Sequence, residues 1–177
     1  MMKQLLLCTV FLASAAPALA QQQPTSTPGD ARAVFKNRDG QTIGSATLIN
    51  TPNGVLIRAE VSNLPPGPHG FHIHETGQCD ASGGFESAGG HYNPDGQQHG
   101  YFIEGGPHAG DMPNQTVGQD GKMMAQVFNP NVSFEGDATL FDDDGSALVV
   151  HATADDYRSQ PSGAAGDRLA CAVIERN

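Results

Sequence analysis

The stretch NGVLIRAEV, at residues 53–61, opens with an Asn-Gly pair and then places an apolar side chain at every second position. A period of two is that of a β-strand with one face in the core and the other in solvent. The Asn-Gly pair favours a tight hairpin turn before the strand. This combination is typical of antiparallel β-proteins.

Short runs of the same kind lie on both sides of this stretch, separated by turn signals such as Asp39-Gly40 and Asp120-Gly121. The predicted strands are residues 31–36, 42–49, 55–61, 70–74, 122–128, 131–135, 138–141, 147–151 and 168–174. About eight strands are enough for a closed barrel or a sandwich. Two longer stretches, 75–119 and 152–167, interrupt the spacing, and loops of that length in a compact domain usually carry function.

The composition fits one small, turn-rich domain with an acidic surface. The chain has 177 residues, of which 22 are Gly and 12 are Pro. This length is sufficient for one domain with a sizeable core. The net charge of -10 argues against nucleic acid or an anionic membrane as a partner, because both bind basic surfaces. A small anionic substrate stays compatible with this charge, since a local positive patch can act within an acidic surface.

The first twenty residues have the features of a secretory signal peptide. Lys3 supplies the positive start, residues 5–13 form a short apolar run, and Ala-Leu-Ala at 18–20 is a cleavage site. The alternative is a buried N-terminal helix. Residues 21–30 are polar and read as a flexible lead-in, so the folded domain is expected over 31–177. The chain is therefore expected to be exported, without a membrane anchor.

Cleavage of the signal would leave two cysteines, Cys79 and Cys171. An even pair in an exported chain predicts a disulfide, and two buried free thiols are the alternative. Because the two cysteines are 92 residues apart, the bond would stabilise the fold by about 4 to 5 kcal/mol.

Two groups of histidines have the spacing of metal ligands. His72 and His74 lie two residues apart in a predicted strand, so both imidazoles project to one face. His151 ends another predicted strand and could add a third imidazole. Imidazole nitrogen binds copper, zinc, iron and nickel.

The second group lies on a glycine-rich segment with few apolar side chains, and it consists of His91, His99, His108 and Asp111. Three nitrogens and one carboxylate oxygen match a closed tetrahedral zinc site. A metal would also give this segment an order that burial cannot provide. The pattern predicts two neighbouring sites, one suited to a redox metal and one to zinc. The alternative is a set of independent surface histidines.

Several stretches of the chain resemble the copper, zinc superoxide dismutases. They are GFHIHE at 70–75, AGGHYNP at 88–94, HAGD at 108–111, LVVH at 148–151 and GDRLAC at 166–171. The resemblance runs from about residue 31 to residue 174. It implies an all-β, eight-stranded antiparallel Greek-key barrel or sandwich with two long functional loops. The long segment at 82–87 is similar to the exported bacterial type, which implies a periplasmic location.

The resemblance also implies a division of the ligands between one copper ion and one zinc ion per subunit. The implied copper ligands are His72, His74, His91 and His151, and the implied zinc ligands are His91, His99, His108 and Asp111. His91 would therefore bridge the two ions as an imidazolate.

Further residues match positions around the metals. Asp155 would link His72 and His99, with Asp156 as the competing candidate. His69 would be hydrogen-bonded to backbone near copper, and Arg168 would lie beside copper. Ser162 matches the channel rim, and Cys79 and Cys171 match the intrasubunit disulfide. One departure from the family is Asp167, which stands before Arg168 where a small neutral residue is common. Neighbours in a strand point to opposite faces, so no pairing between Asp167 and Arg168 is expected.

The implied activity is the dismutation of superoxide to dioxygen and hydrogen peroxide. Arg168, which is always charged, would orient the anionic substrate, and the bridging ring of His91 would take up a proton as copper gains an electron. A dismutase-like protein that stores or delivers copper without turnover is the main alternative. A zinc hydrolase is a third reading, which a saturated zinc site disfavours. Members of the family occur as monomers and as dimers, so a homodimer is compatible with the sequence.

Overall fold

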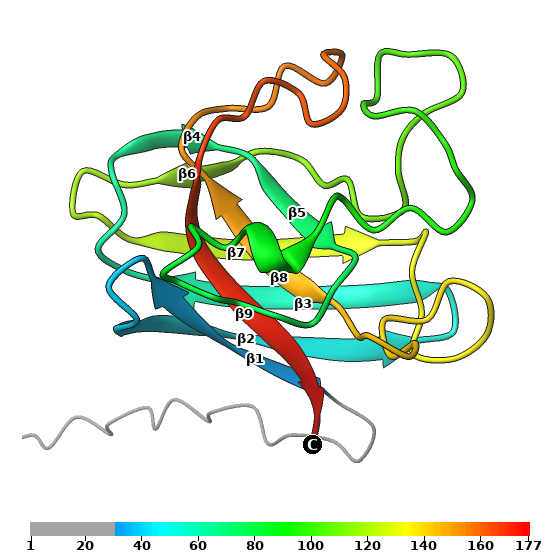
Figure 1. The fold of residues 1–177 in the computed structure, drawn as a ribbon, viewed down its shortest axis with the longest axis horizontal. Coiled ribbons are helices and arrows are strands. Elements are labelled where there is room, and N and C mark those ends of the chain that lie inside the picture. Colours follow the sequence, from blue (N-terminus) through cyan, green and yellow to red (C-terminus); the bar gives the residue numbers. More distant parts are fainter. Residues whose placement is uncertain (1–30) are drawn as a thin grey trace, which may run out of the picture.

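A computed structural model describes residues 31–177, which form an all-β domain (Figure 1). Its strands are β1 (Ala31–Asn37), β2 (Thr42–Thr51), β3 (Gly54–Val61), β4 (Gly67–His69), β5 (Phe71–His74), β6 (Gln115–Val117), β7 (Met123–Asn129), β8 (Ala147–His151) and β9 (Arg168–Arg176). One 3-10 turn, η1 (Glu86–Ala88), follows β5. The predicted signal peptide and lead-in lie outside the described residues.

The strands form one antiparallel sheet in the order β4-β6-β7-β3-β2-β1-β9-β8-β5. The two ends of this order are β4 and β5, yet only Gly70 separates them along the chain. The sheet therefore curls until its two edges meet, which makes a nearly closed barrel. The predicted all-β antiparallel class is confirmed, with nine strands in place of about eight.

The interior of the barrel is filled by alternate residues of its strands. On β3, Val55, Ile57, Ala59 and Val61 are all buried, as the alternating pattern predicted. The β7 strand follows the same rule, because Met123, Ala125, Val127 and Asn129 are buried and the residues between them are exposed. Burial of these apolar faces is the main force that stabilises the fold.

Two of the predicted strands are wrong. Residues 131–135 and 138–141 form a loop with one isolated bridge, between Ser133 and Thr139. Their apolar side chains Val132, Phe134 and Leu140 are buried. The alternation of apolar residues therefore identified buried positions correctly, but these positions do not belong to paired strands. The structure adds the three-residue strands β4 and β6, of which β6 lies within the predicted loop 75–119.

Parts of the segments that follow β5 and β8 lie together on one side of the barrel, at the top of Figure 1. The backbone N–H of Phe102, in the first segment, donates a hydrogen bond to the carbonyl of Tyr157, in the second (3.2 Å). These are the two loops whose length indicated function. Across residues 31–177, helices that could cross a membrane by length and hydropathy are absent.

Candidate metal centre

Strand β5 organises the centre, because chain segments bind both of its edges. One edge pairs with β8, which brings His151 close to His72 and His74. On the other edge, the Ile73 N–H donates to the Gly110 carbonyl (2.9 Å) and the Ile73 carbonyl accepts from the Tyr92 N–H (2.8 Å). These bonds hold the neighbouring loop residues, His91 and Asp111, against the strand.

The structure brings the predicted ligands together in two groups. The first group is His72, His74, His91 and His151, and the second is His91, His99, His108 and Asp111. Within each group the ligand atoms lie within 4.8 Å of one another, and all seven side chains are buried. His91 belongs to both groups.

Hydrogen bonds orient the imidazoles of the first group. The Nδ1 atoms of His74 and His151 lie 3.0 and 3.2 Å from the carbonyls of Gly89 and Gly166. A carbonyl only accepts, so Nδ1 carries the hydrogen and Nε2 keeps a free lone pair. The Nε2 atoms of these two histidines face each other at 3.2 Å. Two free lone pairs thus converge inside the group.

The Asp111 carboxylate lies beside all three histidines of the second group. Oδ1 of Asp111 lies 2.8 Å from His91 Nδ1, 3.0 Å from His99 Nδ1 and 3.4 Å from His108 Nδ1. Its other oxygen, Oδ2, accepts from the backbone N–H groups of Gly100 (2.9 Å) and His108 (3.0 Å). The backbone therefore fixes the carboxylate around which the three rings gather.

The described residues fit bound metal ions. Their buried side-chain polar atoms without a hydrogen-bond partner are His72 Nδ1, His91 Nε2, His108 Nδ1 and Ser146 Oγ. An unpartnered buried polar atom costs free energy, so a cluster of three such nitrogens is suited to bind a metal ion. Four imidazoles suit copper, and three imidazoles with one carboxylate suit zinc.

The electrostatics of the first group favour metal over protons. Burial lowers the pKa of His151 to about 3, with a further contribution from His72. Burial also lowers the pKa of His91 to about 4, although its hydrogen bond to Asp111 opposes the shift. The pKa of His74 falls well below its usual value, through burial and the neighbouring His91 and His151. These rings are therefore neutral at neutral pH, which is the form that binds metal.

Carboxylates reverse this shift at His99. Burial alone would lower the pKa of His99, but hydrogen bonds to Asp111 and Asp155 outweigh it and raise the pKa to about 9. Burial would raise the pKa of both carboxyls, yet their histidine partners hold each pKa well below its usual range. Both acids are therefore ionised.

Asp155 connects the two groups. Its Oδ2 lies 2.8 Å from His72 Nε2, and its Oδ1 lies 3.0 Å from His99 Nε2. The competing candidate, Asp156, is exposed and accepts hydrogen bonds from Ser159 instead. These contacts assign the link between His72 and His99 to Asp155.

Asn114 holds Asp155 in place and was missed in the sequence. Its Oδ1 accepts from the Asp155 N–H, and its Nδ2 donates to the Asp155 carbonyl, both at 2.8 Å. A side-chain amide that satisfies both backbone groups of one residue fixes the position of that residue. A single Asn, 41 positions away in the sequence, carries no spacing signal that could have identified it.

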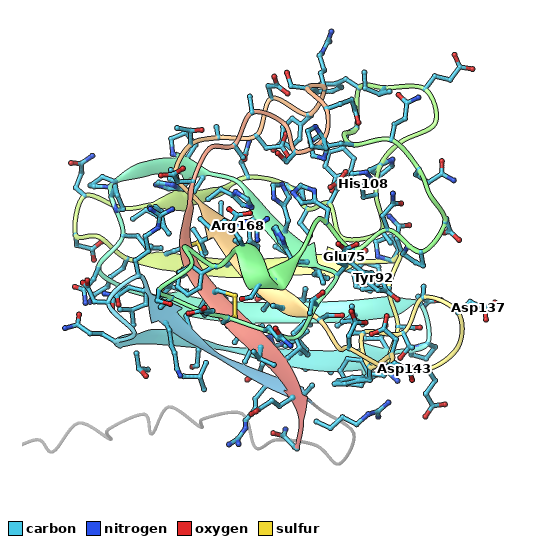
Figure 2. All side chains as sticks on the ribbon, in the orientation of Figure 1. Glu75, Tyr92, His108, Asp137, Asp143 and Arg168 are labelled. Carbon is cyan, nitrogen blue, oxygen red and sulfur yellow. A yellow bond between two sulfur atoms is a disulfide. The ribbon has the colours of Figure 1, made fainter. Side chains whose placement is uncertain are left out.

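Arg168 lies at the start of β9, beside η1 (Figure 2). Its Nη1 donates to the Phe85 carbonyl (2.5 Å) and its Nη2 to the Gly89 carbonyl (2.7 Å), the same carbonyl that contacts His74. The guanidinium is thus anchored next to the first histidine group, and the Arg168 side chain is only 13% exposed.

The neighbouring Asp167 pairs with Arg38, a residue that the sequence analysis did not single out. Their side chains approach to 3.4 Å, and Arg38 Nε also donates to the Arg168 carbonyl (2.8 Å). As predicted, Asp167 does not pair with Arg168. Its carboxylate pairs with Arg38 instead.

Three further predicted features have clear positions. Cys79 and Cys171 form a disulfide, so the alternative of free thiols is excluded. His69 has both ring nitrogens against backbone carbonyls, of His151 (2.7 Å) and Pro65 (2.8 Å), and belongs to neither group. Ser162 is half-buried in the loop after β8, where its carbonyl accepts from the Ala165 N–H (3.3 Å).

Known proteins share both the sequence and this architecture. The family model for copper/zinc superoxide dismutase (SODC) matches residues 42–174. Superoxide dismutase [Cu-Zn] 1 of Aquifex aeolicus is 49% identical over 142 residues, covering 78% of this chain and 83% of its own. Superoxide dismutase [Cu-Zn] of Caulobacter vibrioides is 41% identical over 149 residues, with 82% and 85% covered.

Solved structures agree with these relatives. A SOD-like protein from Bacillus subtilis superimposes with a TM-score of 0.77 at 38% identity, over 80% of this chain and 96% of that one. The Cu/Zn superoxide dismutase from Brucella abortus gives a TM-score of 0.67 at 30% identity, over 82% and 99% of the two chains. The catalysed reaction is the dismutation of superoxide, with copper and zinc as cofactors. Fold, histidine groups and relatives agree, and the chain belongs to the copper/zinc superoxide dismutase family.

Proposed function

We propose that the four-histidine group holds copper, that the group containing Asp111 holds zinc, and that His91 serves both ions. The membership of His91 in both groups is the observation that carries this assignment. Its Nδ1 lies on the Asp111 carboxylate, and its Nε2 has no partner in the described part of the chain. One ring nitrogen is therefore available to each group.

Copper, when bound, supplies the reversible one-electron change that oxidises one superoxide to dioxygen and reduces a second to peroxide. The second half of the reaction consumes two protons. His91 can hold one of them at Nε2, because that nitrogen is buried and free of other partners. Asp111, Asp155 and Asn114 keep the rings in place while the proton moves.

Arg168 is proposed to orient the substrate. Its guanidinium carries a positive charge and is anchored by two carbonyls beside His74. A fixed positive charge raises the local concentration of a small anion, which matters on a chain with a net charge of -10. Ser162 is proposed as part of the rim of the same approach path.

The assignment is tested by metal analysis of the purified protein together with electron paramagnetic resonance of its copper. We expect one copper and one zinc per chain, and a copper signal that changes when zinc is removed, because His91 links the two sites. Binding of one ion at full loading, or a copper signal that is insensitive to zinc, would contradict a shared ring.

Replacement of Arg168 tests the role in substrate orientation. We expect Arg168→Ile to lower the rate constant by about tenfold, at the lower end of charge-guided effects, with both metals retained. Arg168→Lys keeps the charge and is expected to retain most of the rate. The measurements are pulse radiolysis and metal content, and a parallel loss of rate and metal would contradict the assigned role.

Export to the periplasm is also proposed. The signal-like residues 1–20 support it, as does the Cys79–Cys171 disulfide, since disulfides persist in oxidising compartments. Fractionation of expressing cells should find the protein in the periplasm with Gln21 as its first residue. A cytoplasmic protein that keeps its first twenty residues would refute the export.

A further inference from the structure

The guanidinium of Arg168 has a carboxylate next to it. Oε2 of Glu86 lies 3.6 Å from Nη2 of Arg168. The Glu86 side chain is 79% exposed, whereas that of Arg168 is 13% exposed, so the acid sits on the solvent side of the pair. Two carbonyls already accept from Nη1 and Nη2, which leaves few N–H groups for an anion arriving from solvent.

The local backbone keeps Glu86 at this place. Glu86 is the first residue of η1 and follows Phe85, whose carbonyl accepts from Arg168 and whose φ of 66° is left-handed. The same backbone that anchors the arginine therefore carries the acid beside it. Within residues 31–177, Arg168 is the cation that Glu86 approaches within ion-pair distance.

Asp167 offers a comparison, because it adjoins Arg168 in the sequence but has a cation of its own. Its carboxylate pairs with Arg38 at 3.4 Å, and Arg38 also binds the Arg168 carbonyl. The two acids next to Arg168 thus differ in one respect. Asp167 forms its ion pair with Arg38, whereas Glu86 forms its ion pair with Arg168, the residue proposed to orient the substrate.

We infer that Glu86 competes with superoxide for Arg168 and thereby lowers the rate of substrate capture. An exposed ion pair is weak and exchanges readily with solvent ions, so the carboxylate reduces the availability of the arginine without blocking it. Glu86 acts on the rate through Arg168 and is not itself a catalytic residue. This inference rests on the proposed role of Arg168.

The test compares Glu86→Gln with Asp167→Asn in the metal-loaded enzyme. Both substitutions remove one negative charge next to Arg168 and keep the side-chain shape. At low ionic strength we expect Glu86→Gln to raise the second-order rate constant about threefold and Asp167→Asn to raise it by less than about 1.5-fold. At about 1 M salt, where the screening length is about 3 Å, the variants should converge.

A binding measurement separates anion capture from chemistry. Calorimetric titration with inorganic phosphate should show about threefold tighter binding to Glu86→Gln than to the parent enzyme. The double variant Glu86→Gln with Arg168→Ile should show no gain in rate or in phosphate affinity over Arg168→Ile alone. Unchanged metal content and melting temperature would exclude a change in folding as the cause.

The outcomes distinguish this inference from the proposed function. If Arg168→Ile leaves the rate unchanged, the role of Arg168 fails and the inference fails with it. If Arg168→Ile is slow but Glu86→Gln is no faster than the parent, Glu86 does not compete. A slower Glu86→Gln would mean that the acid holds the arginine in place. Equal gains from both acids would show a long-range charge effect, and each of these results overturns the inference.

Discussion

Gly163 stands where the link between the two histidine groups leaves no space for a side chain. It has a φ of +67°, and an added Cβ would collide with Oδ1 of Asp155 and lie 2.7 Å from Nε2 of His99. The absence of a side chain at one loop position therefore leaves room for the hydrogen bond between Asp155 and the His99 ring. Two independent requirements, backbone conformation and space, select glycine here.

Gly163→Ala is expected to be more harmful than Gly136→Ala. Gly136 has a similar φ of +84° and nothing within 4 Å of its added Cβ, so it reports the backbone cost alone, about 1 to 2 kcal/mol. Gly163→Ala adds a clash with Asp155 and should also weaken metal retention. Denaturant unfolding and chelator competition measure the two effects. Equal losses in both variants would mean that the clash relaxes freely.

Asp155→Asn should weaken metal binding by about 10- to 100-fold, the usual cost of losing a partner of a ligand histidine. The amide would keep one acceptor and place a donor against the ring of either His72 or His99. Asp156→Asn is the matched control, because that neighbour is exposed and contacts neither histidine. Metal affinities from chelator titration decide the comparison, and similar values for the two variants would contradict the link.

Sequence spacing was informative for the ligands and silent about their supports. His72 and His74 could be predicted as a pair because strand geometry puts alternate residues on one face. Asn114 and Arg38 act on Asp155 and Arg168 across 41 and 130 positions, so no local pattern reports them. Their roles arise from how the loops fold over the barrel.

At the scale of elements, alternation predicted strands well where a neighbouring strand offered a free backbone edge. The prediction of β3 was correct, because β2 and β7 pair with it along its length. The residues at 131–135 and 138–141 place apolar side chains in the core but share only one isolated bridge, between Ser133 and Thr139. The strands β4 and β6 escaped prediction because each has three residues, too few to show a period.

The disulfide joins the loop that contains η1 to β9, and so fixes the carbonyls that bind Arg168. The double variant Cys79→Ser with Cys171→Ser is expected to lose about 4 to 5 kcal/mol of unfolding free energy, from the entropy of the opened chain. Its rate constant for superoxide dismutation should also fall at unchanged copper content, because the loop carbonyls that bind Arg168 would no longer be held in place. Denaturant unfolding and pulse radiolysis test both, and an unchanged rate would show that β9 alone positions the arginine.

The whole molecule combines a barrel whose interior is filled by apolar side chains with seven buried polar side chains on β5, β8 and the loop after β5. Metal removal should therefore leave the barrel folded and lower the melting temperature. A metal present at about a thousand times its dissociation constant adds about 4 kcal/mol, which sets the scale of the loss. Calorimetry of the chelated and reloaded protein measures it. A melting temperature that does not respond to metal would contradict the fit of the two groups.

The closure of the barrel at Gly70 has a consequence for how the chain tolerates change. Because β4 and β5 meet across a single residue, the length of this join sets which way each side chain of β5 faces. One inserted residue would turn every side chain of β5 to the opposite face. Ile73 would then point toward the metal-binding side, and His72 and His74 would point into the apolar core. The placement of two metal-binding histidines in this enzyme therefore depends on the number of residues that separate β4 from β5.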